Sequence, residues 1–278
     1  MSFSTPHSAT LPGAVIRHAL ALVGALGVLW GYAVFAPVLS TEAVIAVWIA
    51  LALVMVSALF PRKRLRRQAW RRAYLEPASA WQWRLKGGVV MWACQAVKAL
   101  VLSAVLMAIL ARVRDPAIWR LMLAGVLGLV VARAFSHRRL QRDLNEQYRP
   151  EVVWRLSLAV TGAVLVLVLV GLAFLRAQPD FTAASLAQAI WHQVDQEAAR
   201  SGLLHEGLRL LAAKEGVQLW LAQNLGELPV AGWPVIVVVW LLVFIEQALF
   251  VTALLLLFNG VLSRIPPEAI GGAHARAS

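Results

Sequence analysis

The chain has 278 residues, of which 60% are hydrophobic and only 14% are charged. Soluble domains carry about 25% charged residues, so the composition excludes an ordinary soluble domain. The apolar residues gather in runs of about 18 to 25, the length that a helix needs to cross the hydrocarbon core of a bilayer. We therefore predict an all-α, polytopic membrane protein.

The formal net charge is +12, which on its own would suggest nucleic-acid binding. The basic residues, however, cluster where predicted spans end on one side, as cytoplasmic anchors do. No nucleic-acid partner is therefore expected. The single cysteine, Cys94, falls inside a predicted span, so neither a disulfide framework nor a cysteine metal site is expected within one chain.

The first predicted span covers residues 14–38, after a polar and flexible tail at 1–13. A signal peptide is the alternative, because Ala33–Ala36 resembles a cleavage site. The apolar part of about 18 residues is longer than the usual 7–15, so we favour a retained span. The span also contains three closely spaced glycines, Gly24, Gly27 and Gly31. Small residues at such spacing let helices approach closely in lipid. We expect these glycines to pack against another helix of the same molecule rather than to form a dimer contact.

A second span, 43–60, leads into the most basic stretch of the chain. Residues 61–88 hold nine Lys or Arg against one acidic residue, which places this loop and the N-terminus in the cytoplasm. Apolar residues recur at helical spacing among the arginines, a pattern typical of an amphipathic helix lying on an anionic membrane surface. The residues expected to anchor it are Arg62, Lys63, Arg64, Arg66, Arg67, Trp70, Arg71 and Arg72.

The third span (89–110) runs outward and the fourth (117–135) returns to a second basic loop at 136–152. After the fifth span (153–175), residues 176–232 hold four basic and six acidic residues, which suits the far side of the membrane. Their apolar stripes predict two or three short amphipathic helices. The sixth helix lies within 233–260, before a cytoplasmic tail at 261–278. The predicted fold is thus six transmembrane helices, arranged as three hairpins with a small extracytoplasmic helical cap.

The two cytoplasmic loops resemble each other. Phe60–Arg67 aligns with Phe135–Arg142 at an offset of 75 residues, and both segments follow a helical hairpin and precede an outward span. A tandem hairpin repeat would explain this, and internal repeats occur in many transporters. The similarity can also arise without duplication, because any membrane hairpin that ends in Phe and several arginines has a similar sequence. We give this second explanation more weight.

Two opposite charges fall near the middle of predicted spans. Lys98 is the tenth residue of 89–110 and Glu246 the thirteenth of 234–258, which puts both near the bilayer midplane at about 1.5 Å per residue. A lone charge there costs at least about 2.5–3.5 kcal/mol. We therefore predict a pair or a shared aqueous cavity, flanked by Gln95 and Gln247. A salt bridge that fixes helix packing is favoured over a proton or ion relay, because the other spans offer few polar groups.

Nothing in the sequence indicates an enzyme. No GxSxG, Walker or Rossmann motif is present. The pairs His192–Asp195 and His205–Glu206 raise the question of a metal, but a zinc site needs further ligands in defined geometry. We expect solvated helix faces there, with no metal and no cofactor.

The sequence favours a non-catalytic subunit or scaffold of a membrane assembly, in the envelope or export machinery of a bacterial inner membrane, with both termini cytoplasmic. The alternative is a small ion- or proton-coupled channel or secondary transporter that uses Lys98 and Glu246. The expected partners are the lipid bilayer, anionic lipid headgroups, and other membrane subunits or a second copy of the chain.

Overall fold

The computed structural model describes residues 11–74, 88–140, 149–176, 178–224 and 233–265, and all regular structure in these ranges is helical. Within them, six helices are long and apolar enough to cross a membrane. They are α1 (Leu11–Phe35), α2 (Thr41–Tyr74), α4 (Val89–Arg112), α5 (Pro116–Leu140), α6 (Arg149–Leu175) and α9 (Trp233–Ser263). The predicted fold of a polytopic helical membrane protein is confirmed.

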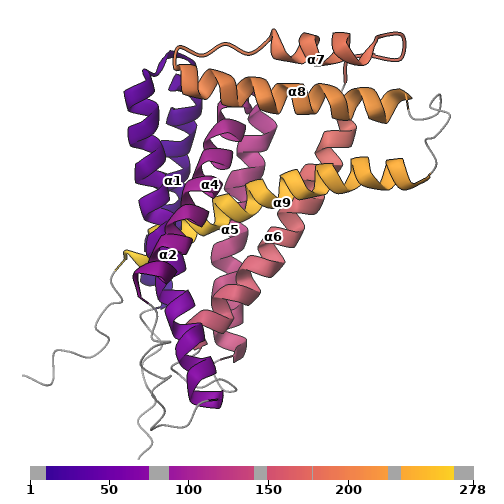
Figure 1. The fold of residues 1–278 in the computed structure, drawn as a ribbon. Helices are drawn as coiled ribbons and strands as arrows, with labels where there is room; N and C mark the ends of the chain where they lie inside the picture. The colour runs from indigo at the N-terminus through magenta and orange to yellow at the C-terminus, as the bar shows by residue number, and fades with distance from the viewer. Residues whose placement is uncertain (1–10, 75–87, 141–148, 177, 225–232, 266–278) are drawn as a thin grey trace, which may run out of the picture.

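Helices α1, α2, α4, α5 and α6 extend between the two ends of the bundle, and α9 crosses them (Figure 1). Two further helices, α7 (Leu186–Val194) and α8 (Gly202–Asn224), lie across one end of the bundle; we call residues 178–224 the cap. The opposite end, where α2 and α5 finish and α4 and α6 begin, is called the basic end. Helix α9 starts near α8 and runs obliquely across the bundle, away from the cap.

The bundle has an apolar core to which nearly every long helix contributes. Helix α2 packs mainly on α4, and α5 on α6, while α9 crosses α2, α6 and α4. Helix α1 packs chiefly on α5, α4 and α9. Among the long helices, the most extensive contacts therefore lie between helices joined through the two basic segments, and not within the predicted hairpins α1–α2 and α4–α5. The duplication stays a prediction. The largest fully buried apolar side chains are Leu22, Leu29, Met55, Leu106, Leu110, Met122, Val126, Leu129, Leu254 and Phe258.

The basic stretch is a direct continuation of α2 and not a separate surface helix. Pro61 lies inside α2, which runs on to Tyr74; proline removes one backbone donor, a loss that membrane helices tolerate. Helix α5 similarly extends through 136–140, so the predicted start of the second basic loop is wrong. Exposed side chains on the stretch are Lys63, Arg64, Arg66, Arg67 and Trp70, whereas Arg62 is half-buried. The side chains of Arg71 and Arg72, the segments 75–87 and 141–148, and most of both predicted tails lie outside the described residues.

The small residues that bring helices together are not those of α1. A Cβ atom added to Gly24, Gly27 or Gly31 would meet nothing within 4 Å, so the predicted packing role of these glycines within the molecule is wrong. Helix α1 uses its leucine face instead. The close approach occurs at Gly260 of α9, where an added Cβ would overlap the carbonyl oxygen of Val54 in α2. Only glycine lets these two helices cross at that separation.

Candidate functional site beneath the cap

The cap is a compact pair of helices. Helix α7 begins with a capping box, in which the Gln188 amide donates to Ser185 Oγ (3.3 Å) and the Ser185 amide donates to Gln188 Oε1 (2.8 Å). Helix α8 buries Leu204, Leu208 and Ala212, a stripe with a period of four residues that gives it one apolar face. A Cβ atom on Gly216 would lie 2.7 Å from the carbonyl oxygen of Ala189, so α7 and α8 are nearly in backbone contact.

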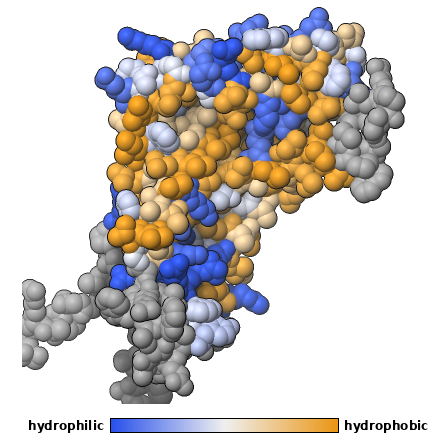
Figure 2. All heavy atoms as spheres, in the orientation of Figure 1, coloured by the Kyte–Doolittle hydropathy of each residue, from blue (hydrophilic) through white to orange (hydrophobic). Residues whose placement is uncertain are grey.

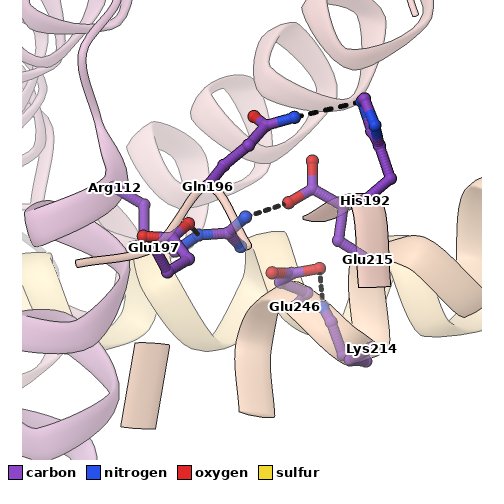
Figure 3. A network of polar contacts seen from close by, with 7 residues as sticks. All are labelled: Arg112, His192, Gln196, Glu197, Lys214, Glu215 and Glu246. Carbon is purple, nitrogen blue, oxygen red and sulfur yellow. Dashed lines mark hydrogen bonds and ion pairs between the residues drawn. The ribbon is translucent and has the colours of Figure 1, made fainter. Parts of the chain in front are cut away.

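One arginine ties the cap to the bundle (Figure 3). Arg112 is the last residue of α4; its Nε donates to Glu197 at 2.6 Å, and its Nη2 lies 2.6 Å from a carboxylate oxygen of Glu215 in α8. The Arg200 amide also donates to the carbonyl oxygen of Pro37 at 2.9 Å. The cap is thus bound to the end of α4 and to the short turn that follows α1.

Glu246 is part of the same layer, and its partner is not the predicted one. It forms an ion pair with Lys214 of α8, next in sequence to Glu215 (Figure 3). Lys98 is exposed on α4 and, among the described residues, has no ion-pair partner. It lies 14 residues before Arg112, about 21 Å along the helix. The predicted Lys98–Glu246 pair is therefore wrong. Because α9 runs obliquely, its middle lies near the cap, and the position of a residue along α9 does not give its depth in the bundle.

The glutamines predicted to flank the pair are half-buried. Within the described residues, neither Gln95 nor Gln247 is hydrogen-bonded to Lys98 or Glu246. Sequence reasoning also missed Arg112, Lys214 and Glu215. The signal that could have found them is the pair of adjacent opposite charges at Lys214 and Glu215, together with the arginine that follows the third predicted span.

The ion pair interrupts an apolar surface. Figure 2 shows a hydrophilic patch between α8 and α9 with apolar surface around it, and the side chains of Lys214 and Glu246 are 35% and 26% exposed. The neighbouring half of α9 exposes large apolar side chains on most of its circumference: Val237, Val238, Trp240, Leu241, Leu242, Phe244, Ile245 and Leu249.

The interior of the bundle is mostly apolar by contrast, although it also buries Thr161 of α6 and Asn259 of α9. Only two polar residues, Ser103 and Ser157, are among its largest fully buried side chains in the described part of the chain. Each hydroxyl donates to a carbonyl oxygen of its own helix, Leu100 at 3.0 Å and Val153 at 2.7 Å. These bonds satisfy the two hydroxyl donors within their own helices.

One cap histidine, His192, makes its contacts within the cap. His192 lies 3.1 Å from the amide nitrogen of Gln196, and its ring meets that of Phe181 edge-on at 5.5 Å. No group of three or more histidine, cysteine, aspartate or glutamate side chains is arranged to hold a metal ion in the described ranges.

No family model matches the chain, and no curated protein or solved structure shows significant similarity to it. Function is therefore inferred from the contacts and surfaces of the molecule itself.

Asp115 makes the stability of the cap end of the bundle depend on pH. Its carboxylate accepts from Arg176 Nη2 at 2.6 Å and from the Ala117 amide at 2.7 Å, which joins the start of α5 to the segment after α6. The hydrogen bond from Arg176 has the largest effect, and together these hydrogen bonds hold the pKa of Asp115 below its ordinary value of 3.8. A carboxyl with a depressed pKa stabilises the fold fully above its unfolded pKa and loses that contribution as the pH falls through its folded pKa.

We expect Asp115→Asn to lower the thermal midpoint at neutral pH, and the difference from the wild type to shrink as the pH falls below 3.8. Thermal unfolding of both proteins in detergent across this range measures it. A difference that is independent of pH would contradict a role for the carboxylate charge.

Proposed function

We propose that this protein is a non-catalytic subunit of a membrane protein assembly, and that the outward face of α4 around Lys98 contacts a partner helix carrying a carboxylate. Lys98 carries the proposal because it is exposed in the middle of a membrane-spanning helix. Its neighbours on that face, Val90, Val97 and Val101, are exposed and apolar. A charge placed there costs at least about 2.5–3.5 kcal/mol in lipid, and an acidic side chain from a partner would offset that cost.

The alternative, a channel or transporter that uses Lys98 and Glu246, has less support. The two charges lie at different levels of the bundle, and Glu246 is bound to Lys214. The largest fully buried side chains of the described residues are mostly apolar, whereas a transport route needs polar groups along its length.

The orientation follows from the charge. Lys and Arg gather at cytoplasmic ends of membrane helices, so in this proposal the basic end faces the cytoplasm and the cap faces outward, as expected for a bacterial inner membrane. The cap, bound to α4 and α9 through Arg112 and Lys214, would then present a rigid outer surface to the same assembly.

Photo-crosslinking tests the contact on α4. A photoreactive residue at Val97, which is 60% exposed beside Lys98, should give one defined protein product in native membranes. The matched control is Val131 on the apolar outer face of α5, 67% exposed, where only lipid adducts are expected. Adding Lys98→Met should weaken the association at least about tenfold, because it leaves the partner carboxylate without its cation.

The yield of the Val97 product, quantified by mass spectrometry, is the measurement. Equal products at Val97 and Val131, or a yield at Val97 that Lys98→Met leaves unchanged, would refute the proposed partner surface.

A further inference from the structure

A group of cations lies at the basic end, where α2, α5 and α6 meet, and has no part in the cap network. At its centre is Trp154 of α6, whose side chain is 3% exposed. Two guanidinium groups flank the indole ring: Arg62 Cζ lies 4.7 Å from the ring centroid and Arg133 Cζ lies 5.9 Å from it. Arg62 comes from α2 and Arg133 from α5, so three helices build this cluster.

Two arginines of the cluster share one carboxylate, that of Glu151. Glu151 Oε2 lies 3.6 Å from Arg62 Nε, and Glu151 Oε1 lies 2.8 Å from Arg155 Nε. The other charges that act on Arg62 are those of the cations Arg133 and Arg155. One carboxylate thus serves two arginines, although the Arg62 side chain is only 21% exposed.

Arg133 is left without a counter-charge. Its side chain is half-buried, and no carboxylate pairs with it within the described ranges. The other ionisable groups that sense its charge are imidazoles, His18 of α1 and His137 of α5. A guanidinium held partly out of water without an anion is costly, so this position favours the binding of an anion.

The indole nitrogen of Trp154 points to the same conclusion independently. Nε1 is buried and has no hydrogen-bond partner in the described part of the structure, whereas the great majority of buried donors are satisfied. Among the described residues, this donor therefore has no acceptor, although two guanidinium groups lie beside it. Phosphate oxygens fit this donor set best, because guanidinium binds phosphate with paired hydrogen bonds and the oxygens accept from neutral N–H groups as well.

We propose that Arg62, Arg133 and the indole N–H of Trp154 bind the phosphate group of an anionic phospholipid. The cluster lies toward the ends of three membrane-spanning helices, and headgroup phosphates lie at the ends of such helices. This site differs from the exposed basic face of α2, where Arg64 and Arg66 provide only a diffuse attraction to an anionic surface.

Native mass spectrometry of the full-length protein in mild detergent, titrated with phosphatidylglycerol or phosphatidylcholine, tests the site. The wild type should retain one phosphatidylglycerol in preference to phosphatidylcholine. Arg62→Gln and Arg133→Gln should each weaken this binding about tenfold, and Trp154→Phe, which keeps the ring and removes the N–H, about fivefold. The matched control is Arg66→Gln, an exposed arginine of the same helix, which should bind phosphatidylglycerol as the wild type does.

Thermal midpoints measured with added lipid give a second readout. Phosphatidylglycerol should raise the midpoint of the wild type and of Arg66→Gln, and raise it less in Trp154→Phe, which carries the test if an arginine variant does not fold. Equal losses in Arg66→Gln and Arg133→Gln would show diffuse attraction and overturn the proposal. Stabilisation by inorganic phosphate alone, with none by phosphatidylglycerol, would overturn the assignment to a lipid.

Discussion

Gly260→Ala is expected to destabilise the protein by about 3 kcal/mol, near the upper limit of the usual cost of overpacking. The added Cβ would overlap the carbonyl oxygen of Val54, and its other near neighbours are also atoms of Val54. A helix backbone cannot move aside as a flexible side chain can, so α9 must lift from α2 along their whole contact. Because α9 also packs on α4 and α6, the displacement should reach most of the bundle.

Gly128→Ala is the matched control. Gly128 is also a helical glycine of a membrane span, but a Cβ there meets nothing within 4 Å. This change should be neutral or should stabilise the helix by up to about 1 kcal/mol, since alanine has the higher helix propensity. Thermal unfolding in detergent, followed by circular dichroism, compares the two variants. Equal midpoints would mean that α9 and α2 do not cross at Gly260.

Arg112→Gln is expected to cost about 2–3 kcal/mol and to loosen the cap. The change leaves two carboxylates without their cation, and Glu197 is only 10% exposed. Removing one partner of a buried pair costs about 3–5 kcal/mol; the Arg112 side chain is 19% exposed, and water then screens part of the interaction. Limited proteolysis should cut between α7 and α8 faster than in the wild type, because Glu197 lies in that connection.

A double variant separates the charge from the loss of packing. Arg112→Gln combined with Glu197→Gln should recover part of the lost stability, since the uncompensated carboxylate is gone. Arg209→Gln serves as the control: Arg209 pairs with Glu206 at 3.7 Å on the surface of α8, a contact worth less than about 1 kcal/mol. Cap proteolysis that is equally fast in Arg112→Gln and Arg209→Gln would refute the anchoring role of Arg112.

Arg112 and Lys214 connect the cap to two different helices of the bundle. Arg112 links α8 to the end of α4, and Lys214 links α8 to the middle of α9.

The sequence predicted the helices themselves well, for a local reason. Apolar runs of about 20 residues can satisfy their backbone hydrogen bonds in lipid only as helices, so each predicted span has its helix. The boundaries were less certain where polar residues continue a helix, as they do from Pro61 to Tyr74, because helical hydrogen bonding does not require an apolar side chain.

Contacts between helices were not predictable in the same way. The small residues of α1 at Gly24, Gly27 and Gly31 have the expected spacing but no neighbour, whereas the single glycine Gly260 makes the close crossing. Spacing reports which residues share a helix face, but it does not report which face meets another helix.

By itself, the sequence determined six membrane-spanning helices, the basic residues at one end of the bundle and a helical cap, because length, hydropathy and charge along the chain act locally. Only the tertiary structure decided that Glu246 binds Lys214, that Arg112 holds the cap, and that Arg62 and Arg133 flank Trp154. The physical reason is that α9 runs obliquely across the bundle and that these contacts join side chains from helices distant in sequence. Both depend on packing angles, which no single segment encodes.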